Sequence, residues 1–211
     1  MRTDPRAIRT LLGAASKPSR FAQRCLETCN APIDGIALDI PCGAGRHIET
    51  LRARGYAVVG ADISAVLLDE ARRRSEQSTA VAVKAAFIRV DATRPLPFVK
   101  DLFDVVLAVH YYVHGVVREL SMLVKPGGCF ILETFGAQGG NYVQLPLQGE
   151  IRSELRGDWL ILEEHEHSVR SAPNRCVVRF FGRRRASGMI SEAEALSKIS
   201  PASLSRSSPP P

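Results

Sequence analysis

The fold of this chain is decided by the stretch Ala37-Leu-Asp-Ile-Pro-Cys-Gly-Ala-Gly-Arg-His47, followed after a helix-like segment by Val58-Val-Gly-Ala-Asp-Ile-Ser64. An apolar run ends in the acid Asp39 and breaks into a glycine turn, and a second apolar run ends in Asp62. The order strand, glycine loop, helix, strand, acid is the first half of a nucleotide-binding βαβ unit. We therefore predict a doubly wound α/β sheet with a ligand at the ends of these strands.

The glycine turn has the features of a ligand-binding loop. Gly43 and Gly45 leave room where a Cβ would keep a ligand away from the backbone. A helix that opens near Arg46 would direct free N–H groups and the positive end of its dipole toward the same place. Asp62, at the end of the second strand, can accept hydrogen bonds from both hydroxyls of a ribose.

The glycine spacing disfavours a dinucleotide. The dinucleotide fingerprint is Gly-x-Gly-x-x-Gly, in which the third Gly permits close packing of the helix on the strand. In this chain Ile48 stands at the third position, after Gly43 and Gly45. The pattern therefore argues against NAD or FAD and for another nucleotide.

The same pattern recurs farther along the chain. A third predicted strand, 86–90, ends at Asp91, and a fourth, 103–107, leads into His110-Tyr-Tyr-Val-His114. Lys125-Pro-Gly-Gly128 turns into a fifth strand, 129–135. Strands at 158–164 and 175–181 form a hairpin that completes the sheet.

These motifs together resemble the class I S-adenosylmethionine (SAM)-dependent methyltransferases, over about residues 37–182. Pro41 stands where the first motif of that family has its first Gly. The run Glu133-Thr-Phe-Gly136 with Gly139-Gly-Asn-Tyr142 resembles the small bacterial tellurite-resistance and thiopurine type. The resemblance implies a Rossmann-like sheet of seven strands in the order 3-2-1-4-5-7-6, with the last strand antiparallel and helices on both faces.

The resemblance also implies SAM as the cofactor and assigns a role to each matching residue. Asp39 would orient the amino group of the methionine portion, the loop would admit that portion, Asp62 would bind the ribose, and Ile63 would pack on the adenine. The predicted cofactor-binding residues are Asp39, Pro41, Gly43, Gly45, Asp62, Ile63, Asp91 and Ala92.

The stretch after the fourth strand should face the transferred methyl. We predict His110 and Tyr111 as the catalytic candidates, because an imidazole can remove a proton and an aromatic ring can stabilise a sulfonium. The alternative is that Tyr111 and Tyr112 pack under the lid and that His114 caps a helix or packs on it. Candidate substrate contacts are Tyr112, His114, Asn141 and Tyr142, although 139–142 also has the composition of a polar surface loop.

Composition excludes several classes of protein. The net charge of +6 is diffuse, without the basic stripe typical of nucleic-acid binders. The five cysteines are scattered, and no apolar run approaches the ~20 residues of a membrane span. His110 and His114 have no acid between them, so we predict no metal site. We expect a reduced cytoplasmic protein, a monomer or homodimer, that binds a small-molecule acceptor and neither nucleic acid nor membrane.

The chain divides into three segments. Residues 1–36 read as two short helices that cover the cofactor as a lid, although their arginine content also permits a targeting peptide. Residues 37–185 form the methyltransferase-like domain. Residues 186–211 are rich in Ser and Pro, a composition typical of a disordered tail.

The function implied by the resemblance is in-line transfer of a methyl group from SAM to a small molecule. Three alternatives stay open. The first is an NAD-linked oxidoreductase, and the second is an RNA or protein methyltransferase. The third is a SAM-binding regulator or partner subunit without catalysis.

Overall fold

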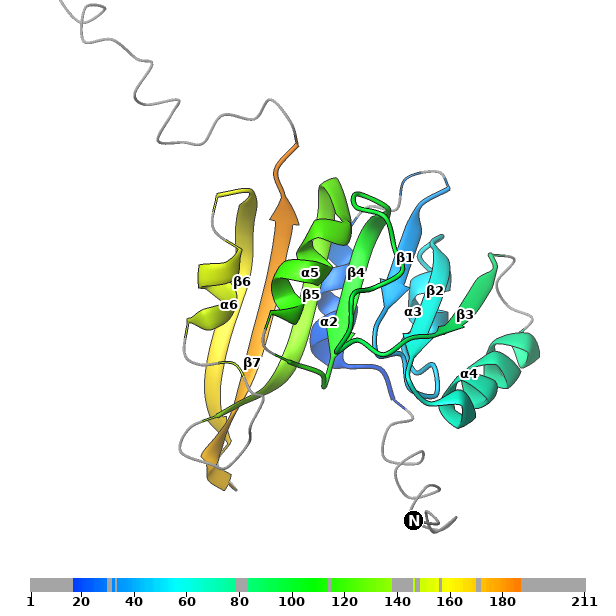
Figure 1. Cartoon of the computed structure of the whole chain (residues 1–211), viewed down its shortest axis with the longest axis horizontal. Helices are drawn as coiled ribbons and strands as arrows, with labels where there is room; N and C mark the ends of the chain where they lie inside the picture. The colour runs from blue at the N-terminus through cyan, green and yellow to red at the C-terminus, as the bar shows by residue number, and fades with distance from the viewer. Residues whose placement is uncertain are drawn as a thin grey trace, which may run out of the picture.

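The structure is a computed structural model, and it describes residues 17–29, 32, 34–78, 83–113, 115–137, 146, 149–155, 157–169 and 172–186. Its strands join one sheet in the order β3-β2-β1-β4-β5-β7-β6, with β7 antiparallel to both of its neighbours (Figure 1). This order and the antiparallel last strand confirm the prediction. The strands are β1 Ile36–Asp39, β2 Ala57–Asp62, β3 Ala85–Arg89, β4 Phe103–Val109, β5 Val124–Ala137, β6 Trp159–Val169 and β7 Ala172–Arg184.

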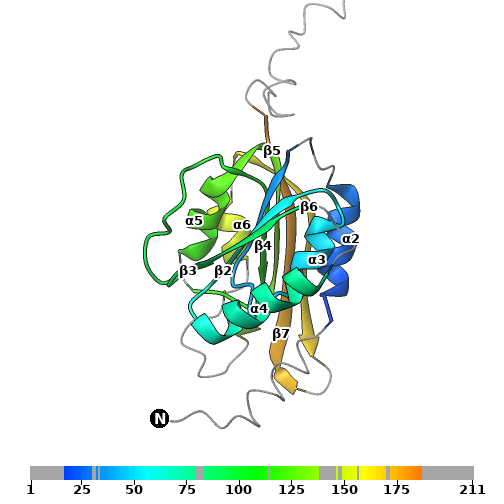
Figure 2. The same cartoon turned by 90° about the vertical axis from the view of Figure 1, so that its right-hand side faces the viewer.

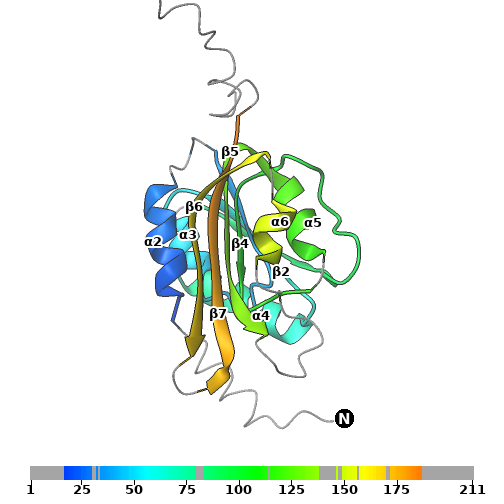
Figure 3. The ribbon, with the colours of Figure 1, turned by 90° about the vertical axis from the view of Figure 1, so that its left-hand side faces the viewer.

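Helices cover both faces of the sheet, as predicted. α2, α3 and α4 pack on one face, and α5 and α6 pack on the other (Figures 2 and 3). Within the described residues, no helix is long and apolar enough to cross a membrane. The helices are α2 Arg20–Thr28, α3 Ile48–Arg52, α4 Ala65–Gln77, α5 Val116–Leu123 and α6 Glu150–Glu154.

The core follows from the alternation of side chains along the central strands. In β4, Val105 and Leu107 face the layer of α2–α4, while Val106 and Ala108 face the layer of α5 and α6. Both sets are buried, as expected for a central parallel strand covered on each face. Each large aliphatic side chain buried in this way contributes about 1.5–3 kcal/mol to folding.

The N-terminal segment contains one helix among the described residues. α2 begins after Ser19, whose hydroxyl caps the helix by accepting a hydrogen bond from the Ala22 N–H at 3.2 Å. Its apolar face, which includes Phe21 and Leu26, is buried against the sheet. The helix predicted before it, and the tail predicted from Ala186 on, lie outside the described residues except for Ala186 itself.

One helix boundary differs from the prediction. The helix expected to open near Arg46 begins at Ile48 and has five residues. The chain reaches it through turns, because Gly43 (φ +53°) and Gly45 (φ +81°) hold left-handed backbone conformations that cannot continue a right-handed helix. α3 thus begins two residues after Arg46, and the role predicted for its N-terminus toward a ligand stays a prediction.

Candidate functional site

Two cavities adjoin at the carboxyl ends of the parallel strands, which is where ligands bind in open α/β sheets. The first, here called the Asp91 cavity, is about 180 Å³ and is lined by Ile40, Pro41, Asp62, Ile63, Val90, Asp91, Ala92, Thr93 and Tyr111. The second, here called the His110 cavity, is about 190 Å³ and is lined by Pro41, Cys42, Gly43, Ala44, Arg46, Asp62, Val109 and His110. Pro41 and Asp62 line both, so the two cavities meet at these residues.

Asp62 is buried at this junction and already organises the backbone around it. One carboxylate oxygen accepts from the Gly43 N–H at 2.9 Å, and the other accepts from the Ser64 N–H at 2.8 Å. The side chain is 6% exposed. A carboxylate has about four acceptor positions, so two remain for hydroxyl groups entering from either cavity.

The two glycines of the loop meet different surroundings. A Cβ on Gly43 would meet no atom within 4 Å, so this residue leaves open space beside the His110 cavity. A Cβ on Gly45 would lie 2.9 Å from the Cβ of Ala71, so this glycine lets the loop pack on α4. The Gly45 N–H also donates within the loop, to the Cys42 carbonyl at 2.9 Å. The predicted contact of Gly45 with the cofactor stays a prediction.

Asp39 is a buried acid that lacks polar partners among the described residues. Neither carboxylate oxygen has a hydrogen-bond partner, and the side chain is fully buried. Burial raises the pKa of Asp39 to about 8, against a lowering by nearby Arg46. A buried carboxylate of this kind calls for a cationic or hydrogen-bonding ligand group. Asp39 lines neither cavity, so it would reach such a group through a water or after a small rearrangement.

His47 lies next to Asp39 without forming an ion pair. Its Nδ1 is 3.8 Å from the Asp39 carboxylate, which is too long for a hydrogen bond. Its Nε2 accepts from the Ser19 N–H at 3.1 Å, so that nitrogen carries no proton. Burial, with nearby Arg46 and His110, lowers the pKa of His47 to about 3, and the ring is neutral at physiological pH.

His110 directly follows β4, has a positive φ of 61° and lines the His110 cavity. A guanidinium nitrogen of Arg46 lies 3.3 Å from His110 Nδ1. Because a guanidinium can only donate, Nδ1 is the acceptor. Burial and the charge of Arg46 lower the pKa of His110, which favours the neutral ring. In this arrangement Nδ1 can take up a substrate proton only after Arg46 moves.

The two tyrosines after His110 point to different places. Tyr111 lines the Asp91 cavity, and its buried hydroxyl has no hydrogen-bond partner among the described residues. Tyr112 is buried in the core, where its hydroxyl donates to Glu150 at 2.6 Å, and it lines neither cavity. Tyr111 therefore lines a different cavity from His110. Tyr112 lines neither of the two, and its predicted substrate contact stays a prediction. His114, Asn141 and Tyr142 lie outside the described residues.

Three other residues predicted to bind the cofactor line the Asp91 cavity. Ile63 is 56% exposed at the mouth of the Asp91 cavity, and Asp91 and Ala92 line its wall. The Asp91 carboxylate accepts from the Thr93 N–H at 3.0 Å and from the Thr93 hydroxyl at 2.6 Å, and these bonds lower its pKa. The structure thus brings the acids predicted for ribose and adenine to one cavity. The Ile40–Pro41 peptide bond at its floor is cis.

Sequence reasoning missed a polar network that joins α2 to the end of β5. Glu133 accepts from the Ser19 hydroxyl and from Arg179 Nε, the latter at 2.8 Å. Its carbonyl accepts the His110 N–H at 2.6 Å. The signal available was Glu133 itself, an acid that directly follows the apolar run Cys129-Phe-Ile-Leu132. Among the described residues, no group of three or more His, Cys, Asp or Glu side chains could hold a metal ion.

Residues 37–128 match the model of a family described as a methyltransferase domain. A demethylmenaquinone methyltransferase from Clavibacter sepedonicus is 36% identical over 112 residues, which cover 50% of this chain and 43% of the relative. The chain thus spans less than half the length of this relative. The matched region includes the glycine loop and the three strand-end acids.

Solved structures share the fold at low sequence identity. A geranyl diphosphate C-methyltransferase from Streptomyces coelicolor, solved with S-adenosyl-L-homocysteine, has a TM-score of 0.63 at 16% identity, over 77% of this chain and 76% of that one. The cyclase SpnF has a TM-score of 0.61 at 18% identity, over 79% of this chain and 82% of that one. The fold is therefore shared with proteins named for more than one kind of reaction.

Proposed function

We propose that this chain is a SAM-dependent methyltransferase that acts on a small molecule. The observation that carries the proposal is Asp62, a buried carboxylate at the junction of two cavities that also holds the glycine loop. The methyltransferase-domain match over the same residues supports it. We extend the domain to residues 37–185 and treat the N-terminal helix as part of a lid.

The residues present fit a nucleoside joined to an amino acid. Asp62 has acceptor positions left for ribose hydroxyls, and Asp91 with Ala92 and Tyr111 would hold the adenine in the Asp91 cavity. Open space at Gly43 would admit the methionine portion to the His110 cavity. The unpartnered carboxylate of Asp39 suits its ammonium group, directly or through water.

When bound, SAM supplies a methyl group that its positive sulfur already activates for in-line displacement. The protein's task is then to align the acceptor and exclude water, which can contribute ~7–11 kcal/mol. Arg46 and His110 line the cavity on the side proposed for the methyl. His110 would orient the acceptor, and would accept its proton once Arg46 moves. A dedicated base is not required when the acceptor ionises by itself.

The acceptor class follows from the cavities and the relatives. Both cavities are small, and a relative is named for demethylmenaquinone, so we propose a small, electron-rich acceptor such as a hydroquinone or another phenol. The finer resemblance to the tellurite-resistance and thiopurine type extends the set to thiols and oxyanions of soft elements. We propose a cytoplasmic location.

The test is transfer of an isotopically labelled methyl group from SAM to a panel of hydroquinones, catechols, small thiols and tellurium or selenium oxyanions. We expect labelled product with at least one class, and its loss in Asp62→Asn. Binding of S-adenosylhomocysteine without turnover of any acceptor would favour the regulator or partner-subunit alternative. Binding of NADH in its place would overturn the proposal.

A further inference from the structure

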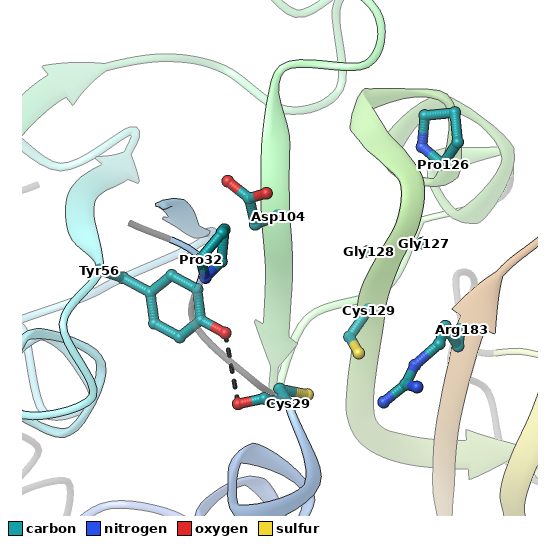
Figure 4. A pocket seen from close by; sticks show the side chains of 9 residues that line it. All are labelled: Cys29, Pro32, Tyr56, Asp104, Pro126, Gly127, Gly128, Cys129 and Arg183. Atoms are coloured by element: carbon teal, nitrogen blue, oxygen red, sulfur yellow. Dashed lines mark hydrogen bonds between the residues drawn. The ribbon is translucent and has the colours of Figure 1, made fainter. Parts of the chain in front are cut away.

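A third cavity lies at the amino ends of the parallel strands, opposite the strand ends that bear the two cavities described above. It is about 260 Å³, and it is lined by Cys29, Pro32, Tyr56, Asp104, Pro126, Gly127, Gly128, Cys129 and Arg183 (Figure 4). Pro126 and Gly127 on its rim are exposed, so the cavity opens to the surface. Nothing in the proposed methyl transfer uses these residues.

Two cysteines from different elements meet in this cavity. Cys29 follows the last turn of α2, and Cys129 lies in β5, against which α2 packs. Both thiols are reduced and buried. The Cys29 thiol donates to the Cys25 carbonyl at 3.4 Å, and the Cys29 and Cys129 side chains line the same cavity. Figure 4 shows the two sulfur atoms and the Arg183 guanidinium gathered on one side of the cavity.

The surroundings make Cys129 the more reactive of the two. Arg183 is its direct partner in the antiparallel register of β5 and β7, so a positive charge lies beside Cys129. The neighbouring Cys29 first, and then Arg183, lower the pKa of Cys129 against the effect of burial. The neighbouring Cys129 and burial raise the pKa of Cys29. A thiolate beside a neutral thiol is the arrangement of an attacking and a resolving cysteine.

The position of Cys29 is fixed by its neighbours. The Tyr56 hydroxyl donates to the Cys29 carbonyl at 3.4 Å, and Arg183 donates to the carbonyl of Thr28 at 3.0 Å. The end of α2 is therefore held over β5 from two sides.

We propose that Cys29 and Cys129 form a modification site, in which a hydroperoxide oxidises Cys129 and Cys29 resolves the product to a disulfide. The Cys129 thiolate attacks one peroxide oxygen, the O–O bond breaks, and Cys129 becomes a sulfenic acid while water or an alcohol leaves. The Cys29 sulfur then attacks the Cys129 sulfur, the S–O bond breaks, and water leaves. Two thiols lose two electrons, and the peroxide gains them. The disulfide would join the end of α2 to β5.

The test is oxidation of the reduced full chain with equimolar hydrogen peroxide, followed by digestion without reductant and mass spectrometry. We expect a peptide pair linked through Cys29 and Cys129, lighter by two hydrogens than the sum of its parts. Cys29→Ser and Cys129→Ser should each abolish it. The matched controls Cys25→Ser and Cys42→Ser, which change buried cysteines outside the proposed pair, should keep it.

A second measurement tests the reactivity of the Cys129 thiol without forming the disulfide. In the absence of peroxide, iodoacetamide should alkylate Cys129 about tenfold faster than Cys42 at neutral pH, because rate follows the thiolate fraction. Arg183→Gln should slow this labelling, and Arg183→Lys should restore part of it. A crosslink through Cys25, oxidation of Cys129 to sulfinic acid without a crosslink, or equal labelling of Cys129 and Cys42 would overturn the proposal.

Discussion

The Gly43 N–H donates to the Asp62 carboxylate at 2.9 Å, so the acid that ends β2 fixes the loop that follows β1. β1 and β2 are neighbouring parallel strands, so the loop after β1 lies beside the end of β2, where Asp62 lines both cavities and Gly43 lines the His110 cavity. Asp62 is thus a structural residue before any ligand arrives. A substitution there changes the loop as well as the ligand contact, and this governs how its variants are chosen.

Asp39→Asn should change how stability depends on pH. The folded pKa of Asp39 is about 8, above its ordinary value of 3.8, so between those values the folded chain holds a proton that the unfolded chain has released. Stability therefore falls as pH rises through this window. Asn removes this dependence. Between pH 5 and pH 8.5, the free energy of unfolding of the wild type should therefore fall by at least ~1.4 kcal/mol more than that of Asp39→Asn, which is the equivalent of one pKa unit. Urea unfolding at both pH values measures it, and parallel curves for the two proteins would contradict the account.

Tyr111→Phe and Tyr112→Phe form a matched pair. The Tyr111 hydroxyl is buried without a partner among the described residues, so its removal should leave stability unchanged and weaken S-adenosylhomocysteine binding by ~0.5–1.5 kcal/mol. The Tyr112 hydroxyl donates to Glu150, so its removal should destabilise the fold by ~1–3 kcal/mol and leave affinity unchanged. Thermal melts and calorimetry separate the two effects. The reverse pattern would place the ligand on the Tyr112 side.

Ser19→Ala should loosen α2 from the site. The variant loses the helix cap and the hydrogen bond to Glu133, and we expect a cost of ~0.5–2 kcal/mol and faster proteolysis within α2. Ser64→Ala loses the equivalent cap of α4, whose hydroxyl accepts from the Leu67 N–H at 3.3 Å, and serves as the control. Both should lower stability, while only Ser19→Ala should raise the rate of cleavage in α2. Equal cleavage in the two variants would show that Glu133 does not hold the helix.

His110→Gln should lower the rate of methyl transfer less than tenfold with an acceptor that ionises readily. The reason is that Arg46 occupies Nδ1, so His110 contributes orientation more than proton removal. With an acceptor of high pKa the loss should be larger and should depend on pH. Initial rates with two phenols of different acidity test this. A loss above a hundredfold with both would identify His110 as an obligatory base.

The sheet was predictable because its strands are short apolar runs whose ends are marked by acids and glycines. Asp39 and Asp62 end β1 and β2, Asp91 lies two residues beyond the end of β3, and the structure brings the last two acids to one cavity. The length of α3 was not predictable, since the left-handed conformations of Gly43 and Gly45 decide where it begins. The local sequence would also permit a helix that begins at Arg46. The close packing of Gly45 on Ala71 favours a turn at this point instead.

The finer geometry of the site depends on contacts between distant residues. Nothing near Tyr111 and Tyr112 in the sequence separates a cavity residue from a core residue, and the difference comes from Glu150 on α6. The link from Ser19 to Glu133 joins residues 114 positions apart. Contacts of this kind can be predicted only once the fold is known, whereas the acids at strand ends can be predicted from the sequence pattern alone.

The measurement that tests the central claim most directly is calorimetric titration of the full chain with S-adenosylhomocysteine, beside Asp62→Asn and the exposed control Asp69→Asn. We predict micromolar binding to the wild type and to the control, on the scale of about −8 kcal/mol. Asp62→Asn keeps one oxygen acceptor for the loop but loses the charge, and we predict at least a tenfold weaker affinity with a melting temperature that shows the chain is folded. Equal affinity in the wild type and Asp62→Asn, or binding to none of the three proteins, would contradict the assignment of the joined cavities to this cofactor.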